Sequence, residues 1–347
     1  MFRRMICRLE SSQSLLQRFL LQHPDLIQAP FADVLTRWKG SSHPPAPTGQ
    51  PTDEQLREMQ LLNSLNRDNQ LLAPRNASYG IAHFAGESGS TSLAQFLVSH
   101  GISMTGHDTD CGEPLHYAAA GGYLDTLGFL LTKAGGNAWS VGCYGNTLTH
   151  LACSFGQRHV LELLRQLGVL QAHVMLRNSA RELPVLSAAC HGHESCIAYF
   201  REHGLDVTVT DHQGRGCCHF AAEQGHVGVL HYFVTECGTA SLSQVDKFGA
   251  TPAHYAARHG RLNVLSYLSA QQVNLFAEDF KMRTPLVWAV LGGKTKRHVE
   301  CVQFFRENGA DFLYQDPTGK NLAQIAKAKH SDKCNLFVYL ASFLPST

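Results

Sequence analysis

A histidine position recurs along most of this 347-residue chain, and its spacing limits what the chain can fold into. Alignment of the copies on His254 gives steps of 33, 34, 36, 33, 35, 33 and 37 residues between successive copies. The aligned positions are His83, His116, His150, Leu186, His219, His254, Val287 and Gln324. A unit of this length cannot bury its own apolar face, so units repeated at this interval are expected to stack on one another as a solenoid.

The copy at residues 246–260 indicates how one unit folds. Thr251 suits the position before a helix, and Pro252 suits its first turn because no N–H partner is needed there. Gly260 ends this helix, and residues 262–268 form a second one whose leucines share a face. The glycine recurs as Gly89, Gly122, Gly156, Gly192, Gly225, Gly260 and Gly293. Each unit is therefore predicted to be a turn followed by two short helices.

The motif sequences resemble those of ankyrin repeats. The resemblance is carried by residues 113–119 (EPLHYAA), 251–257 (TPAHYAA), 284–286 (TPL) and 307–311 (ENGAD). It extends over residues 75–344. It implies an all-α ankyrin-repeat solenoid of paired antiparallel helices joined by hairpin-like turns. It also implies that the motif histidine bonds backbone between repeats and takes no part in catalysis.

Composition and helix signals divide the chain further. Residues 1–40 are predicted to form an N-terminal helical extension, residues 41–51 a Pro-rich linker and residues 52–74 a helix that starts with a capping-box pattern. The repeat array follows over residues 75–344, and its terminal units are degenerate, as expected of caps. Its predicted parts are an N-terminal cap at 75–107, repeats starting near 108, 142, 178, 211, 246 and 279, and a C-terminal cap at 316–344.

The longest step, from Val287 to Gln324, contains four surplus residues. They are Lys294, Thr295, Lys296 and Arg297. An insertion in a regular array is usually a loop on one face, often the binding face. We therefore expect a basic loop at this point of the array.

The composition narrows the classes of function. A formal net charge of +1 gives no overall attraction to nucleic acid, and no apolar run reaches the roughly 18 residues that a membrane helix needs. Eleven cysteines, an odd number without framework spacing, indicate reduced thiols in the cytoplasm, with the nucleus as the alternative. We expect no nucleic-acid partner and no membrane span.

Three patterns that carry catalytic or ligand chemistry in other proteins have a simpler explanation here. Residues 292–295 (GGKT) lack the glycine that a phosphate-binding loop needs five residues before Gly293, where Trp288 stands. The metal-ligand types at 190–196 (CHGHESC) and the Cys-Cys-His run at 217–219 fall on positions set by the repeat register. We therefore predict no catalytic residue, no metal site and no cofactor.

The residues that the motif does not need are the candidates for partner binding. The ankyrin resemblance places a partner on the turn tips and on the ends of the first helices, along the concave face. Four aromatic residues at such positions are candidate anchors: Tyr144, Phe155, Phe248 and Phe280. The cationic candidates are Arg215, Lys247, Arg258, His259, Lys281, Arg283, Lys294, Lys296 and Arg297. Such a basic surface would steer an acidic or phosphorylated segment. The alternatives are aromatic rings packed on neighbouring turns and an ordinary solvated surface.

The predicted function is that of a non-catalytic scaffold or adaptor. It binds another protein through the concave groove, in particular an acidic segment at the fourth to sixth repeats. One alternative is a substrate-recruiting subunit of a ubiquitin ligase or an effector directed at a host cell, although residues 1–50 show no convincing recruitment box. Another is an enzyme with its site in the N-terminal extension, which at about 75 residues is shorter than most catalytic domains.

Overall fold

A computed structural model of the chain describes residues 15–27, 34, 37, 53, 80–108, 112–293, 295–316, 319–330 and 335–342. The described residues form helices joined by turns, with two isolated β-bridges. The chain divides into two compact units, residues 1–180 and 181–347. In each unit the helices come in pairs, so the predicted all-α repeat fold is confirmed. The predicted linker at 41–51 lies outside the described residues, as does the predicted helix at 52–74 apart from Asp53.

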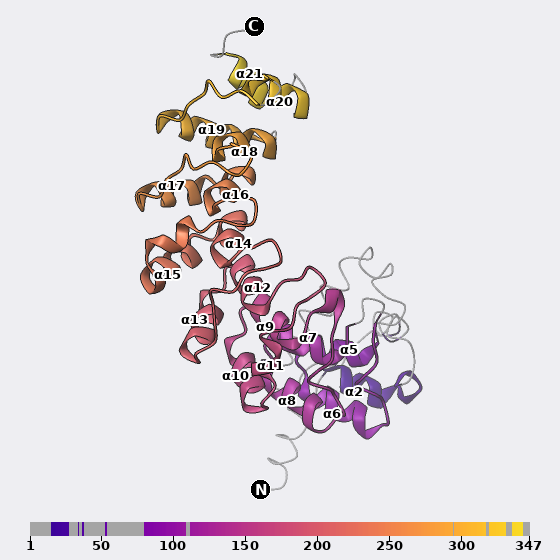
Figure 1. The fold of residues 1–347 in the computed structure, drawn as a ribbon. Helices are drawn as coiled ribbons and strands as arrows, with labels where there is room; N and C mark the ends of the chain where they lie inside the picture. The colour runs from indigo at the N-terminus through magenta and orange to yellow at the C-terminus, as the bar shows by residue number, and fades with distance from the viewer. Residues whose placement is uncertain are drawn as a thin grey trace. The chain divides into compact units, whose positions relative to one another are not determined.

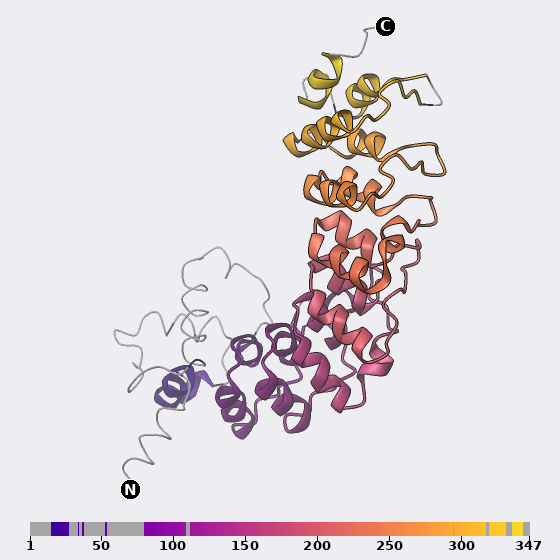
Figure 2. The ribbon, with the colours of Figure 1, turned by 90° about the vertical axis from the view of Figure 1, so that its left-hand side faces the viewer.

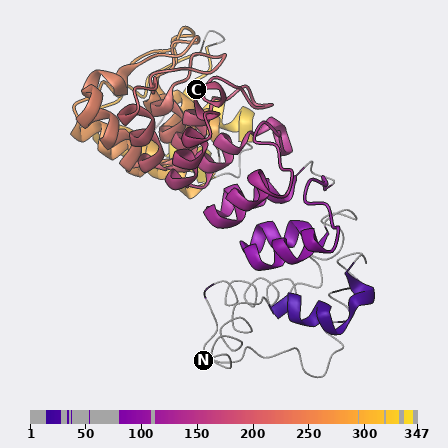
Figure 3. The ribbon, with the colours of Figure 1, turned by 90° about the horizontal axis from the view of Figure 1, so that it is seen from below.

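The first unit holds three pairs of α-helices among its described residues. The pairs are α5 (Ile81–Ser88) with α6 (Thr91–Ser99), α7 (Pro114–Gly121) with α8 (Leu124–Thr132), and α9 (Leu148–Ser154) with α10 (Arg158–Gln166), followed by α11 (Leu170–His173) (Figure 1). The preceding helix α2 (Leu15–Gln22) lies beside α6 (Figure 3). Its Leu16, Phe19 and Leu20 are buried, so part of the N-terminal extension packs on the first repeat.

The second unit stacks five helix pairs within the described residues. They are α12 (Pro184–His191) with α13 (Glu194–Glu202), α14 (Cys217–Gln224) with α15 (Val227–Cys237), α16 (Pro252–Arg258) with α17 (Leu262–Ala270), α18 (Pro285–Gly292) with α19 (Lys296–Glu307), and α20 (Leu322–His330) with α21 (Asn335–Ala341). First helices pack on first helices and second helices on second helices. The turns between pairs project to the same side of this stack, where they form the loops at the right of Figure 2.

Left-handed glycines end the first helix in most repeats. Gly192 and Gly225 have φ angles of 79° and 94°, a region that favours glycine because it has no Cβ. Gly293 differs, because its φ of −177° is extended backbone. The glycine required here is the preceding one, since a Cβ on Gly292 would lie 2.0 Å from the carbonyl oxygen of Arg258.

The prediction of a basic loop in the longest step is wrong for two of its residues. The helix α19 begins at Lys296, directly after Thr295, whose hydroxyl lies 2.7 Å from Nδ1 of His298. Lys296 and Arg297 therefore belong to the first turn of a helix of 12 residues, against 9 in α17. The surplus residues lengthen the second helix of this repeat, and Lys294 lies outside the described residues.

The motif histidines join consecutive repeats. The backbone N–H of Thr251 donates to Nδ1 of His254 at 3.1 Å, so the ring proton lies on Nε2. That nitrogen donates to the carbonyl oxygen of Arg283, in the next turn, at 2.9 Å. His219 makes the same two bonds, at 3.2 Å each, with the start of its own helix and with the following turn. The role in backbone bonding that the ankyrin resemblance implied is confirmed for these histidines.

Folding stability should decrease as the pH falls below about 6.5. Burial lowers the pKa of His83, His116, His219 and His254, because it disfavours the charged ring. The unfolded chain then binds more protons than the folded chain at mildly acidic pH. The stabilisation is complete above the unfolded pKa of about 6.5 and is lost as the pH falls toward the lowered folded values. Urea unfolding between about pH 7.5 and 5.5 measures this effect. The free energy of unfolding should fall by about 1.4 kcal/mol per pH unit for each additional proton that the unfolded chain binds.

His254→Gln is the matched control for this pH dependence. Gln324 already occupies the motif position in the last repeat, where its Oε1 accepts the N–H of Asn321 at 3.0 Å. The variant should keep the bond at the helix start and lose one titrating group, so its stability should depend less steeply on pH. An equal slope in both proteins, or a wild-type midpoint that rises on acidification, would contradict the assignment of neutral buried histidines.

Candidate partner-binding groove

A groove of about 880 Å³ lies in the second unit, along α14, α16 and α18 and the turns that precede them. It brings together eight residues predicted from the sequence: Arg215, Lys247, Phe248, Arg258, His259, Phe280, Lys281 and Arg283. The lining residues that were not predicted as partner contacts are Gln213, Glu223, Tyr255, Trp288, Leu291, Gly292, Lys329 and His330. The groove contains both charged and aromatic side chains, as a protein-binding surface requires.

Five other predicted residues are not part of this groove. Tyr144 and Phe155 belong to the first unit, where they are 81% and 57% exposed. Lys296 and Arg297 lie in the first turn of α19 and do not line the groove. Lys294 is outside the described residues. Their contact with a partner stays a prediction.

Two aromatic anchors stand at the edge of the groove. Phe248 and Phe280 are 52% and 74% exposed, so neither ring is buried on a neighbouring turn. The N–H of Phe280 donates to the carbonyl oxygen of Phe248 at 2.9 Å, and the N–H of Lys247 donates to that of Gln213 at 2.8 Å. A Cβ added to Gly249 would lie 2.6 Å from the Phe280 ring, so the ring rests against this glycine. The turn tips are thus held at a fixed spacing while their rings stay accessible.

Two of the predicted cations hold the turns together. Nε of Arg215 donates to Asp211 at 2.8 Å and Nη1 donates to Glu223 at 3.4 Å. Arg283 binds Asp279 through Nε and Nη2 at 2.8 and 2.6 Å. Burial raises the pKa of both aspartates, but the hydrogen bonds from the arginines and from backbone N–H groups bring each pKa below its usual value. Much of the charge of these two arginines is therefore compensated within the turns.

Four further cations line the groove with no carboxylate within ion-pair distance among the described residues. They are Lys247, Arg258, Lys281 and Lys329. Lys329 belongs to the predicted C-terminal cap and is not among the candidates predicted from the sequence. It reaches the groove because α20 packs on α18, a consequence of stacking that no local sequence signal indicates. These four residues give the groove its uncompensated positive charge.

The floor of the groove is a row of aromatic rings and guanidinium groups. The ring centroids of Tyr255 and Trp288 lie 5.5 Å apart, and the guanidinium carbons of Arg258 and Arg283 lie 5.5 and 5.4 Å from the Trp288 ring. The Tyr255 hydroxyl donates to Asp246 at 2.7 Å. Burial and this hydrogen bond raise the pKa of Tyr255, so the phenol stays protonated. Cation–π contacts of this kind hold the floor in place before a partner arrives.

In the two patterns that suggested metal or thiol chemistry, Cys190 is half-buried and Cys218 is buried. Burial raises the pKa of Cys190 to about 11 and that of Cys218 to about 12, so neither is a thiolate at neutral pH. In the described part of the chain, no group of three or more His, Cys, Asp or Glu side chains is placed to hold a metal ion. Nor does any described helix have the length and apolar character needed to cross a membrane.

Models of known protein families match most of the repeat region. The model described as "Ankyrin repeats (3 copies)" matches residues 81–178 and 218–316, and the model "Ankyrin repeats (many copies)" matches residues 185–234. The human ASB11 ankyrin repeat domain is similar in structure, with a TM-score of 0.53 and 22% sequence identity. The match covers 68% of this chain and 100% of that domain, and it concerns the fold alone.

The curated relatives match this chain over a small part of their own length. The chain is 25% identical over 249 residues to palmitoyltransferase AKR1 of Lachancea kluyveri, which is 70% of this chain and 28% of that protein. It is 28% identical over 169 residues to the nuclear factor NF-kappa-B p105 subunit of Gallus gallus, 48% of this chain and 17% of that protein. The chain thus spans less than a third of the length of these relatives.

The two kinds of groove cation should differ in their effect on stability. Arg283→Met removes the ion pair to Asp279, whose carboxylate is buried, and should lower the free energy of unfolding by about 1–2 kcal/mol. Lys281→Met removes an exposed charge with no such partner and should change it by less than about 0.5 kcal/mol. Urea unfolding of both variants measures the difference. If Arg283→Met lowers the free energy of unfolding as little as Lys281→Met does, Arg283 does not support its turn.

Proposed function

Because the chain belongs to the ankyrin-repeat family, whose repeats generally serve as protein–protein interaction modules, we propose that it is an adaptor that binds a partner protein without catalysis. The partner lies in the groove of the second unit. The observation that carries this proposal is the joint presence of uncompensated cations and exposed aromatic rings along one preformed groove. Aromatic anchors supply most of the binding energy in such surfaces, and complementary charge supplies fast association and selectivity.

The favoured partner is an acidic segment of another protein. Lys247, Arg258, Lys281 and Lys329 are spread along the groove and suit several separate carboxylates. A single phosphate is bound best by arginine forks that converge on it. Because Arg283 already directs two nitrogens at Asp279, the geometry favours a run of Asp or Glu over one phosphorylated residue. Nucleic acid is not the expected partner, since the formal net charge of +1 gives no overall attraction to it.

The expected location is the cytoplasm or the nucleus. Buried thiols such as Cys196, Cys217 and Cys301 suit a reducing compartment. The activity named for the palmitoyltransferase is not carried over to this chain, since the match covers 28% of that protein.

Two double variants of the full-length chain test the groove. Phe248→Ala/Phe280→Ala removes both anchors, and Lys247→Glu/Lys281→Glu reverses two uncompensated charges. Each should weaken binding of the same partner by about tenfold or more, because anchor residues are commonly worth more than 1 kcal/mol and opposed charges lower the association rate. Affinity capture followed by quantitative mass spectrometry compares the partners retained by each variant. Arg283 is left intact, since its substitution would disturb Asp279.

Arg306→Glu/Lys320→Glu is the matched control. It reverses two exposed charges on the same unit, at positions that lie outside the groove and are not predicted contacts. Retention of partners by this control and their loss from both groove variants supports the proposal. Retention of every partner by the groove variants excludes this groove as the binding surface.

A further inference from the structure

Aromatic residues recur beside the buried aspartates of the turns. In three repeats, the aspartate eight residues before the motif position accepts a hydrogen bond from the aromatic side chain that follows that position. Tyr255 donates to Asp246 at 2.7 Å, and Nε1 of Trp288 donates to Asp279 at 3.0 Å. In the first unit, the hydroxyl of Tyr117 donates to Asp108 in the same way. The aromatic ring fills the space between its turn and its helix.

The last repeat keeps the aspartate and lacks the aromatic ring. Asp316 stands eight residues before Gln324, which holds the motif position, and the residue after Gln324 is Ile325. Isoleucine has no hydrogen-bond donor and fills less space than tryptophan. The row of rings formed by Tyr255 and Trp288 therefore stops one repeat before the end of the stack.

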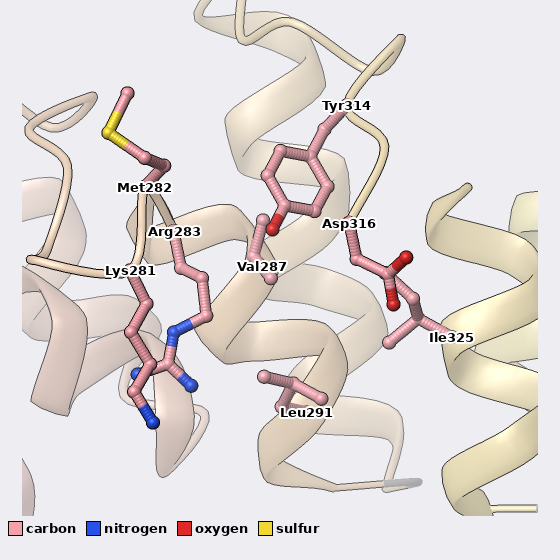
Figure 4. A pocket seen from close by; sticks show the side chains of 8 residues that line it. All are labelled: Lys281, Met282, Arg283, Val287, Leu291, Tyr314, Asp316 and Ile325. Atoms are coloured by element: carbon pink, nitrogen blue, oxygen red, sulfur yellow. The ribbon is translucent and has the colours of Figure 1, made fainter. Parts of the chain in front are cut away.

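A cavity of about 470 Å³ lies where that ring is missing. Figure 4 shows Val287 and Leu291 of α18 along one side of it, with Tyr314, Asp316 and Ile325 along the other. The wall is thus mainly apolar, with a carboxylate at its edge. Asp316 accepts the backbone N–H of Lys320 at 2.9 Å, and a carboxylate can accept several hydrogen bonds, so it can also accept one from an occupant of the cavity.

The cavity continues the partner-binding groove. Lys281, Arg283 and Leu291 line both. A segment that lies along the groove can therefore place one more side chain in the cavity. That contact is intramolecular once the segment is bound, so it does not require a second association event.

We propose that this cavity receives a tryptophan or tyrosine side chain of the acidic partner segment. The N–H or O–H of that side chain donates to Asp316, and its ring lies beside Arg283 on the side away from Trp288. The incoming ring takes the place that Trp288 holds one repeat earlier and completes the row. This proposal rests on the proposed function, and it adds a sequence requirement: an aromatic donor residue next to acidic residues.

Fluorescein-labelled synthetic peptides test the requirement on the wild-type, full-length chain. Each peptide has one central residue, Trp, Tyr, Phe, Leu or Ala, flanked on both sides by glutamates. Fluorescence anisotropy measures the dissociation constant of each peptide, with the protein titrated up to about 1 mM to include weak binding. The Trp and Tyr peptides should bind about tenfold or more tightly than the Ala peptide, with Phe and Leu between them. A Trp peptide with lysines in place of glutamates should not bind.

Ile325→Trp tests the location by filling the cavity from inside the chain. Ile325 is 8% exposed, and the added indole should occupy the place that Trp288 holds in its own repeat. The variant should bind the Trp peptide no more tightly than the wild type binds the Ala peptide, and its affinity for the Ala peptide should not change. Val338→Trp adds the same side chain at an exposed position of α21 and should leave both affinities unchanged. Thermal melting confirms that each variant is folded.

The outcomes separate the two proposals. Equal binding of all glutamate peptides overturns the aromatic cavity and leaves the acidic groove in place. Equal binding of the glutamate and lysine Trp peptides overturns the acidic partner as well. Absence of binding by every peptide overturns both.

Discussion

The hydrogen bonds of the motif histidine are the interaction on which the rest of the structure depends. The rings of His219 and His254 each accept from the start of their own helix and donate to the turn of the next repeat. The bond needs a neutral ring, which burial supplies by lowering the pKa. Because it joins one repeat to the next, it fixes the spacing of the turns from which the groove is built.

The buried aspartates extend this constraint to the groove. Asp246 and Asp279 accept backbone N–H groups within their turns and side-chain donors from the floor, Tyr255 and Trp288. The floor and the turn tips are therefore connected through the same carboxylates. Residues that satisfy these bonds are structural, and Arg283 is among them. Side chains that take no part in them, such as those of the uncompensated lysines and Phe280, are available to a partner.

Much of this arrangement follows from the sequence, because repeat position determines structural environment. The 33-residue interval predicts the helix pairs, and the motif register predicts which side chains line the concave face, including Phe248 and Lys281. The ion pair of Arg283 was missed, although Asp279 lies four residues before it. The helical position of Lys296 depends on where the chain resumes its helix, which Thr295 determines locally. The position of Lys329 in the groove depends on how α20 packs on α18. The sequence of its own repeat does not indicate this packing.

The central claim is that a partner lies along the groove of the second unit, and site-specific photo-crosslinking tests it most directly. The photoreactive side chain is introduced as Phe280→p-benzoylphenylalanine at the turn tip, and as Val338→p-benzoylphenylalanine on α21 for comparison. Both positions are exposed, so neither substitution should disturb the fold. The account predicts a crosslinked product with the partner from position 280 and none from position 338. A product from position 338 alone would contradict it.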